Sequence, residues 1–423
     1  MDLKPGYRKT DAGVLPKDWE VRPLGESLVN RPRYGINAAA VPYSDRLPTY
    51  IRITDISPEG LFAPTELVSV GAAGADGYFL EEGDLVFART GASVGKSYRY
   101  RRDDGQLVFA GFLIRVRPNP EVLLPSYLSA YATTGPYWSW VRLMSMRSGQ
   151  PGINGNEYAL LPVPHPPLAE QKALASALSD VDALLGAMDR LIAKKRDLKQ
   201  AAMQQLLTGQ TRLPGFSGKW ETKRLGDLFV FLRTANNPRA DLNAHGEVGY
   251  IHYGDIHTTS SAFLDCGSAT LPGIHASKVR SAARIEDGDL VMADASEDYA
   301  GIGKCVEVRG AGKRHVVAGL HTFLLRAVPT VMAHGFRGYL QFIPAIRESL
   351  IRLATGISVY GISKSKVRTI EVSVPAPEEQ TAIASVLSDM DAELDALEHR
   401  GNKTRLLKHG MMQELLTGKT RLV

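Results

Sequence analysis

Cysteine is scarce in this chain of 423 residues, which contains only Cys266 and Cys305. The two do not form a CxxC pair or a metal-ligand pattern, so a disulfide framework is excluded and a zinc site is not expected. Long apolar runs are also missing, and none approaches the roughly 20 residues needed to span a bilayer. The polar N-terminus lacks the apolar core of a signal peptide. We therefore expect a cytoplasmic protein with no membrane partner.

The motifs of common DNA-modifying enzymes are absent as well. We find no Asn/Asp-Pro-Pro-Tyr/Phe loop of a methyltransferase. The acidic nuclease pattern matches at Asp197-Leu198-Lys199 and Glu221-Thr222-Lys223, which we expect to be solvated charges on a helix and beside a helix exit. The loop at Arg89–Ser97 resembles a phosphate-binding loop, but it has three residues instead of four between its first glycine and Gly-Lys. His252 and His257 flank Asp255 without a third metal ligand at a supporting spacing. We expect no catalytic residue, metal or cofactor in this chain.

Charge and apolar content are those of a folded protein. Charged residues make up 22% and apolar residues 44%, and the length suits two or three domains. A net charge of +5 and an isoelectric point near 9.0 favour an anionic partner only weakly.

An internal repeat is the strongest signal in the sequence. The segment from Glu170 to Leu213 aligns without a gap to the segment from Glu379 to Leu422, at an offset of 209. Of the 44 aligned pairs, 25 are identical, which chance does not produce. The preceding segments correspond more loosely, for example WEVRPLGE from Trp19 with WETKRLGD from Trp220. The chain therefore carries two folds of one kind, and we expect a pseudo-two-fold arrangement.

Each repeated block reads as a long helix. Apolar residues alternate in steps of four and three, which is the pattern of a coiled-coil seam. A helix of about 40 residues is ~60 Å long, more than one small domain covers, so we predict an intramolecular antiparallel coiled coil instead of two separate amphipathic helices. The second seam is lost at Gly401-Asn402, which leaves the continuity of the second helix open. The seam residues are Leu174, Leu178, Val181, Leu185, Met188, Ile192, Ile383, Leu387, Met390, Leu394 and Leu397.

The regions outside the repeats are rich in strand signals. Short β-branched and aromatic runs such as YIRITDI and DLVFARTG end at Gly, Pro or Asp, with short helical stretches between them. Prolines at positions 162, 164, 166 and 167 are expected to mark the start of the first long helix. The pattern predicts an α+β fold with variable domains at 1–165 and 211–373, and long helices at 166–210 and 374–423.

Recognition is the chemistry that remains. Polar and basic residues gather in loops between the apolar strands, and corresponding loops differ in identity between the two halves. Arg, Asn, Gln and carboxylates read base edges, whereas Lys binds phosphates. The candidate DNA-contacting residues are Arg89, Thr90, Ser93, Lys96, Arg147, Ser148, Gln150, Asn154, His252, Tyr253, Asp255, Asp294, Glu297, Lys304, Tyr360, Ser363 and Lys364.

Basic residues on the helices have two equal interpretations: they face DNA between two half-sites, or they form a solvated flank of the coiled coil. These residues are Lys194, Lys195, Arg196, Lys199, Lys403, Arg405 and Lys408.

Over essentially its whole length the chain resembles the specificity subunits of type I restriction–modification enzymes. The motifs that carry the resemblance are LPKDWEVRPLGE from Leu15, PPLAEQKALASALSDVDALL from Pro166, LLTGQTRLPGFSGKWETKRLGDL from Leu206, and the C-terminal LLTGKTRL. The combination of two variable domains with two repeated helices is specific to this family. Individual base contacts do not transfer, because the recognition domains are the variable part of the family.

The resemblance implies that the variable domains are target-recognition domains, each binding half of a bipartite double-stranded DNA site. It implies that the helices, as central and C-terminal spacers, set the gap between half-sites and dock two modification subunits. Those subunits bind S-adenosylmethionine and methylate adenine, and a restriction subunit using ATP and magnesium joins them. Three alternatives remain: a methylation-only system, a solo DNA-modifying enzyme, or a coiled-coil adaptor that binds only proteins.

Overall fold

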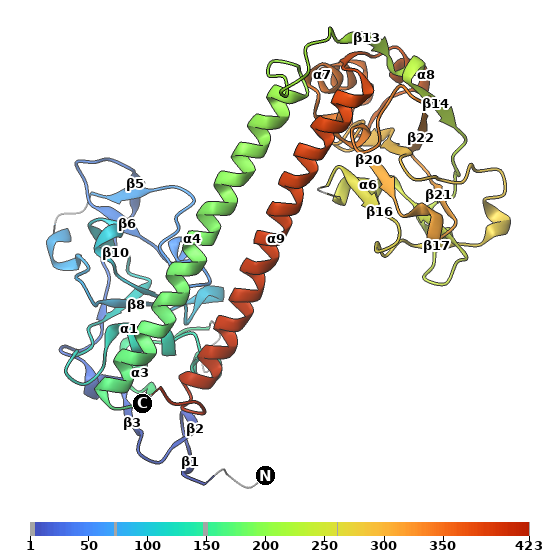
Figure 1. The fold of residues 1–423 in the computed structure, drawn as a ribbon. Coiled ribbons are helices and arrows are strands. Elements are labelled where there is room, and N and C mark those ends of the chain that lie inside the picture. The colour runs from blue at the N-terminus through green and yellow to red at the C-terminus, as the bar shows by residue number, and fades with distance from the viewer. Residues whose placement is uncertain (1–4, 72–73, 147–150, 260, 423) are drawn as a thin grey trace. The chain divides into compact units, whose positions relative to one another are not determined.

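The computed structural model describes residues 5–71, 74–146, 151–259 and 261–422. The chain divides into two compact units (Figure 1). Unit 1 comprises Met1–Asp189 and His399–Val423, and unit 2 comprises Arg190–Glu398. Each unit therefore contains one strand-rich head and a part of both long helices. None of the described helices combines the length and the apolar character needed to cross a membrane.

The described residues of the unit 1 head form short strands, three short α-helices and several single turns of 3-10 helix. The strands are β1 (Tyr7–Thr10), β2 (Gly13–Pro16), β3 (Glu20–Pro23), β4 (Arg33–Tyr34), β5 (Ala40–Pro42), β6 (Thr49–Ile51), β7 (Val68–Val70), β8 (Leu85–Ala88), β9 (Ser97–Arg99), β10 (Leu107–Phe109), β11 (Leu113–Val116) and β12 (Pro162–His165). The helices are α1 (Pro125–Tyr131), α2 (Gly135–Ser145) and α3 (Gly155–Ala159).

The head of unit 2 has the same kind of composition. Its strands are β13 (Glu221–Arg224), β14 (Phe229–Leu232), β15 (Val248–Ile251), β16 (Phe263–Asp265), β17 (Gly273–Ile274), β18 (Leu290–Ala293), β19 (Ala295–Ser296), β20 (Cys305–Arg309), β21 (Val316–Ala318), β22 (Thr322–Ala327), β23 (Tyr360–Gly361) and β24 (Glu371–Val374). Its helices are α5 (Leu225–Leu228), α6 (Tyr253–Thr258), α7 (Pro344–Leu353) and α8 (Lys364–Arg368).

The two heads repeat one sheet topology. In unit 1 a sheet runs β4-β11-β8-β9, and in unit 2 its counterpart runs β14-β22-β18-β20 with β16 added at the edge. The central strands β8 and β18 are fully buried, as their continuous apolar sequences require. A second sheet in each head contains one parallel pair, β6 with β10 and β15 with β21. The predicted α+β fold with two similar domains and two long helices is confirmed.

Only two of the four prolines expected at the start of the first long helix, Pro166 and Pro167, lie directly before it. Pro162 and Pro164 lie in β12, which pairs with β3 in a sheet of only two strands. An edge position tolerates proline because its missing N–H is not needed by a further strand. Helix α4 begins after them, at Leu168.

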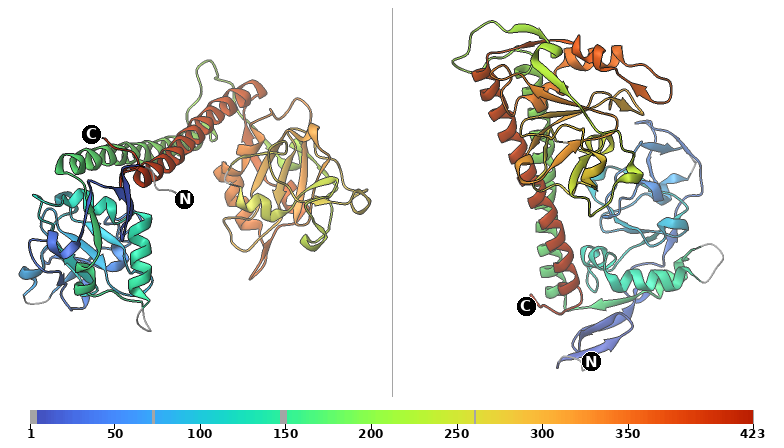
Figure 2. Two further views of the ribbon diagram at one scale, coloured as in Figure 1. Left: turned by 90° about the horizontal axis from the view of Figure 1, so that it is seen from below. Right: turned by 90° about the vertical axis from the view of Figure 1, so that its right-hand side faces the viewer.

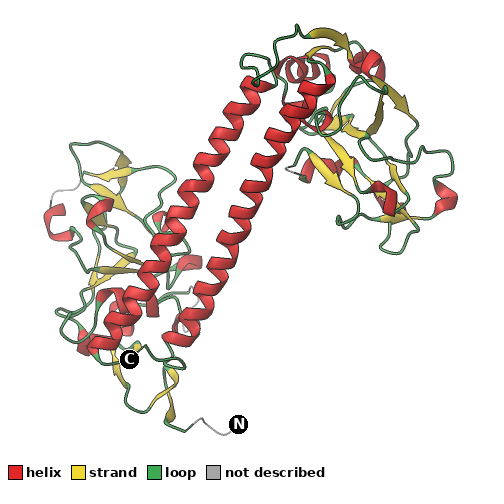
Figure 3. Cartoon of the chain, in the orientation of Figure 1, coloured by secondary structure: helices red, strands yellow, loops and turns green. Residues whose placement is uncertain are grey.

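The repeated blocks form two unbroken helices, α4 (Leu168–Leu206) and α9 (Pro377–Leu415), each of 39 residues (Figures 2 and 3). Gly401 does not interrupt α9. It is buried at the position that corresponds to Ile192 in α4, at the offset of 209. A glycine inside a helix costs about 1 kcal/mol relative to alanine, which 39 residues of continuous hydrogen bonding tolerate.

Within each unit the two helices pair in antiparallel fashion. In unit 1, Lys408 Nζ lies 2.5 Å from Asp182 Oδ1, and Arg405 pairs with Asp189. In unit 2, Arg196 Nη2 lies 2.6 Å from Glu398 Oε1, and Lys199 pairs with Asp391. The second set reproduces the first at the offset of 209, with the two helices exchanged. The ion pairs thus carry the two-fold character of the sequence repeat.

The seam residues have two different destinations. Leu174 and Leu178 join the hydrophobic core of the unit 1 head together with Met412, Leu415 and Leu416 from the end of α9. In unit 2 the equivalent Ile383 and Leu387 join the head core together with Leu206 and Leu207. The start of each helix therefore packs on its own head and on the end of the other helix. The remaining seam residues are buried or half-buried: Val181, Leu185, Met188, Ile192, Met390, Leu394 and Leu397.

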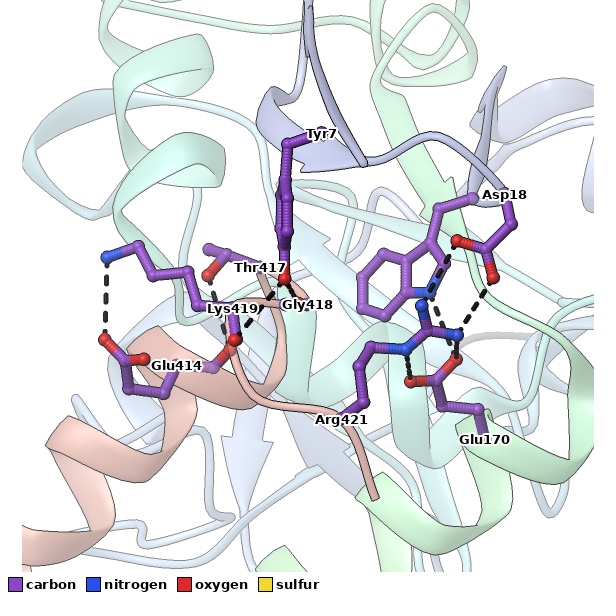
Figure 4. A network of polar contacts seen from close by, with 9 residues as sticks. Tyr7, Asp18, Glu170, Glu414, Thr417, Gly418, Lys419 and Arg421 are labelled. Carbon is purple, nitrogen blue, oxygen red and sulfur yellow. Dashed lines mark hydrogen bonds and ion pairs between the residues drawn. The ribbon is translucent and has the colours of Figure 1, made fainter. Parts of the chain in front are cut away.

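An ion-pair cluster, which we name the unit 1 clasp, joins the C-terminal tail to the unit 1 head (Figure 4). Arg421 Nη2 donates to Glu170 Oε2 over 2.7 Å and to Asp18 Oδ2 over 3.0 Å. Trp19 Nε1 donates to the same Glu170 oxygen over 3.1 Å. Glu170 and Trp19 are completely buried. The hydrogen bonds from Arg421 hold the pKa of Asp18 below its usual range.

The unit 2 clasp has the same core with fewer partners. Arg212 donates to both oxygens of Glu379, over 2.5 and 2.6 Å, and its guanidinium lies 5.7 Å from the ring of Trp220. Lys219 stands where unit 1 has Asp18, and the buried Trp220 Nε1 has no hydrogen-bond partner in the described part of the chain. Arg212 therefore stabilises Glu379 without the second carboxylate and the indole donor of unit 1.

Two equivalent glutamines complete the attachment of each helix to its head. Gln171 Oε1 accepts a hydrogen bond from Leu124 N over 2.9 Å, and its amide nitrogen donates to Val122 and Pro166 carbonyls. Gln380 lies 209 positions later and makes the equivalent three bonds. Its side-chain oxygen accepts from Ala333 N, and its amide nitrogen donates to the Val331 and Pro375 carbonyls. Both glutamines are buried and fully satisfied, which explains the repeated Glu-Gln pair of the sequence.

Candidate nucleic-acid interface

The candidate site in unit 1 lies where three loops of the head meet, immediately after β8. Arg89 N donates to the Phe112 carbonyl over 3.0 Å, and Ile153 N donates to the Arg89 carbonyl over 2.9 Å. Thr90 forms an isolated β-bridge with Gly152. These backbone bonds fix Arg89 and Thr90 between the loop at Phe112 and the loop before α3.

The Arg89 side chain is held in place by an aromatic ring. Its guanidinium lies 4.8 Å from the centre of the Tyr34 ring, within cation–π range. The Tyr34 hydroxyl in turn accepts a hydrogen bond from Gly155 N over 3.0 Å. Arg89 is half-exposed and forms no ion pair with any described residue. Its donors are therefore available to a ligand that offers acceptors.

Asp294 occupies the same place in unit 2. It follows β18 directly, its backbone N donates to the His321 carbonyl over 3.1 Å, and Ile362 N donates to its carbonyl over 2.9 Å. Burial raises the pKa of the Asp294 carboxyl, and His321, whose Nδ1 lies 3.3 Å from Asp294 Oδ1, opposes this effect. Arg89, Phe112 and Ile153 thus correspond to Asp294, His321 and Ile362.

A cluster of imidazoles surrounds Tyr253 beside this position. The Tyr253 ring centre lies 4.5, 5.7 and 5.5 Å from those of His252, His257 and His321. His252 is 7% exposed, and burial lowers its pKa, so it is neutral near pH 7. In the part of the chain that is described, no group of three or more His, Cys, Asp or Glu residues is placed to hold a metal ion.

Several predicted contact residues are committed to the fold itself. Asp255 accepts a hydrogen bond from His252 N over 2.9 Å, and Gly254 N donates to the His252 ring, so both residues cap α6. Asn154 caps α3, and Ser363 caps α8. Capping occupies one ring nitrogen of His252 and one carboxylate oxygen of Asp255. The base-reading roles of these residues stay predictions.

Two of the three predicted phosphate-binding lysines, Lys96 and Lys304, hold equivalent loops of the two heads. Lys304 Nζ donates to the His257 carbonyl over 2.8 Å, and burial lowers its pKa. Lys96 Nζ lies 3.4 Å from the Ile56 carbonyl, the corresponding place in unit 1. Each lysine joins the loop after the central strand to the end of a short helix. In unit 1, Ser93 ends the single helical turn between Arg89 and Lys96 and is half-exposed.

The remaining candidates of unit 2 lie near the strand pair β19–β23. Tyr360 pairs with Ser296 in that ladder and contacts Tyr299, with ring centres 4.0 Å apart and ring planes tilted by 30°. Glu297 is exposed beside them. Lys364 Nζ lies 3.2 Å from the Phe231 carbonyl. Arg147, Ser148 and Gln150 lie outside the described residues.

The basic residues of the helices are mostly engaged in ion pairs. Lys195, Arg196 and Lys199 pair with Glu393, Glu398 and Asp391, and Arg405 and Lys408 pair with Asp189 and Asp182. The pairing favours the interpretation of these residues as the flank of the coiled coil. Lys194 and Lys403 remain exposed.

Comparison with known proteins identifies relatives that span the whole chain. Models of protein families give no match. The MjaX protein of Methanocaldococcus jannaschii, described as a putative type I restriction enzyme specificity subunit, is 23% identical over 98% of this chain and 97% of its own length. The EcoKI specificity subunit of Escherichia coli K12 is 22% identical over 96% of this chain and 89% of its own.

The relatives of this chain are type I restriction enzyme specificity subunits. Solved structures of such subunits share its fold. The type I restriction–modification S subunit from M. genitalium matches with a TM-score of 0.58 and 13% identity, covering 98% of both chains. A chain from a type I R-M system matches with a TM-score of 0.57 and 16% identity, covering 96% of this chain and 99% of its own.

Sequence reasoning missed four residues that shape the candidate site of this specificity-subunit fold: Tyr34, Phe112, Tyr299 and His321. For Phe112 and His321 a signal was available, because the offset of 209 that relates the two helices also aligns these two residues in the sequence. Tyr34 and Tyr299 carry no such signal, because their ring contacts join loops that are far apart in the sequence.

Proposed function

We propose that this chain is the DNA-specificity subunit of a type I restriction–modification system, in which each head binds one half of a bipartite DNA site. The observation that carries the proposal is a scaffold present twice with different chemistry at one equivalent loop position. Arg89 and its aromatic neighbours stand in one head, and Asp294 and its imidazoles stand in the other. Like scaffolds with unlike loops are suited to reading unlike half-sites.

In this role the chain has no active site and no cofactor of its own. The modification subunits bind S-adenosylmethionine and methylate adenine, and two of them dock on the long helices. The restriction subunits, where the system has them, bring ATP and magnesium. The spacing of the heads along α4 and α9 sets the non-specific gap.

Methylation-aware sequencing of host DNA, with and without this gene, tests the proposal. We expect a bipartite methylated adenine motif that disappears when the gene is deleted. The purified chain alone should bind DNA with an affinity that falls with salt, and should not methylate or cut it. Methylation by the chain alone would favour a solo enzyme. Absence of salt-dependent DNA binding would favour a protein-binding adaptor.

Shortening both long helices together should shorten the gap in the motif. Deleting positions 186–192 and 398–404 removes two turns from each helix. The numbers of paired residues, such as 182 with 408 and 199 with 391, sum to 590, and the two deleted segments lie opposite one another by the same rule. The remaining ion pairs therefore stay in register. Seven residues span ~10.5 Å, the rise of about three base pairs.

We expect a gap shorter by about three base pairs, or loss of methylation where the duplex cannot turn to present both half-sites. The half-site sequences should not change. A matched variant that replaces the same positions by alanine keeps the helix length and should keep the gap. An unchanged gap in the shortened protein would contradict the ruler role of the helices.

A further inference from the structure

The strongest contrast between the two heads lies at a single backbone position. Arg89 and Asp294 each follow the buried central strand, donate their N–H to the loop at Phe112 or His321, and accept from Ile153 or Ile362. The strand residue before each makes the same exchange, because Ala88 N donates to the Lys96 carbonyl and Ala293 N to the Lys304 carbonyl. The side chains of Arg89 and Asp294 therefore leave the backbone at equivalent positions of the two heads.

Both side chains keep hydrogen-bonding capacity in reserve. Arg89 rests on the Tyr34 ring and forms no ion pair in the described part of the chain. A guanidinium has five donors and no acceptor, and a ring contact uses none of those donors. Among the described residues, His321 is the one side-chain partner of Asp294, at 3.3 Å, and 26% of the Asp294 side chain is exposed.

We propose that Arg89 and Asp294 are the matched specificity-determining residues of the two heads. Arg89 reads a guanine through its O6 and N7 acceptors, and Asp294 reads a base that presents an amino group in the major groove, cytosine or adenine. This inference rests on the proposed function. It assigns a base class to one position in each half-site.

The neighbours of each residue agree with its role. The Tyr34 ring holds the Arg89 guanidinium 4.8 Å from its centre, and the Tyr34 hydroxyl is itself held by Gly155 N, so the donors of Arg89 are positioned before DNA arrives. His321 has a positive φ of 57°, a conformation that is uncommon for a residue other than glycine. That backbone holds the imidazole beside Asp294, where unit 1 has the apolar Phe112.

The two residues cannot exchange roles. A guanidinium facing an amino group would place donor against donor, and a carboxylate facing O6 and N7 would place acceptor against acceptor. In both cases these groups would lose their water without gaining a hydrogen bond. Discrimination by one well-formed contact of this kind amounts to about 5- to 150-fold between bases. Loss of either residue should therefore relax one position of one half-site and leave the other half-site intact.

Methylation-aware sequencing of cells that carry the full chain with its partner subunits tests the assignment. We expect Arg89→Gln to relax or change one guanine in one half-site, and Asp294→Asn to do the same to one cytosine or adenine in the other half-site. Arg102→Gln and Glu348→Gln remove the same charges from exposed positions of the same heads and should leave the motif unchanged.

Arg89→Lys separates reading from simple attraction. Lysine keeps the positive charge but cannot form the fork of two parallel bonds, so DNA affinity should remain while preference for guanine falls. This variant also covers the case in which Arg89→Gln fails to fold, and Asp294→Glu serves the same purpose in unit 2.

The outcomes distinguish this inference from the proposed function. A wild-type bipartite motif that all four variants of Arg89 and Asp294 reproduce at full occupancy would overturn the pairing of these residues with bases and leave the proposed function standing. The assignment would also be overturned if the Arg89 and Asp294 variants relaxed the same half-site, or if one variant relaxed both half-sites. Absence of any motif in the wild type would mean that the proposed function itself fails.

Discussion

Replacing Arg421 by alanine is expected to lower the unfolding temperature of unit 1 by about 6–12 °C. The substitution leaves the carboxylate of Glu170 buried with the Trp19 indole as its remaining recorded partner. Removing one partner of a buried ion pair costs about 3 kcal/mol or more, because the other charge remains desolvated. Each kcal/mol of destabilisation lowers the unfolding temperature of a domain of this size by about 2–4 °C, which gives the expected shift. Differential scanning calorimetry of the full chain measures it.

The long helices supply the matched control. Lys408 pairs with Asp182, whose side chain is 56% exposed, so Lys408→Ala should cost less than 1 kcal/mol. Arg212→Ala should destabilise unit 2 as Arg421→Ala destabilises unit 1, because Glu379 is equally buried. If Arg421→Ala shifts the transition no further than Lys408→Ala does, the clasp does not hold the tail as its geometry indicates.

The clasp also shows where sequence reasoning ended. The repeated LLTGQTRL and LLTGKTRL were recognised as one element written twice, and helices of the right length were predicted before them. The role of their arginines was not, because Arg421 meets a carboxylate 251 positions earlier in the chain. Periodicity predicts which face of a helix is buried, but it carries no information about a polar partner on another element.

The same limit applies to the candidate interface. The polar loops after the central strands were predicted, and they contain Arg89 and Asp294. Sequence did not separate residues that face outward from those that hold the fold. His252 and Asp255 have the residue types of base readers, yet the turn at the start of α6 uses both as caps. Capping depends on backbone geometry, which one sequence does not reveal.

A fragment that ends at Leu213 is expected to form a stable homodimer. It contains the unit 1 head, all of α4 and the tail with Arg212. In the full chain, α4 is covered by α9, and the end of α9 supplies Met412, Leu415 and Leu416 to the unit 1 core. The fragment carries the same residues at the offset of 209, as Met203, Leu206 and Leu207. A second copy therefore replaces the missing helix.

The ion pairs support the same exchange. Lys199 and Arg196 of one copy stand where Lys408 and Arg405 stand in the full chain, so they meet Asp182 and Asp189 of the other copy. Arg212 of each copy takes the place of Arg421 in the clasp of its partner, because the two arginines occupy the same position of the repeat.

Light scattering measures the mass of the fragment, with Arg212→Ala as its matched variant. We expect a dimer for the unmodified fragment and a weaker, more readily dissociated one for the variant, which loses two clasps in each dimer. A monomer that keeps its helix folded would contradict the exchange, since about half of α4 would then expose its apolar seam to water. If the proposed function holds, the dimer joined to its modification subunits should methylate an inverted repeat of the first half-site, because both heads are then the same.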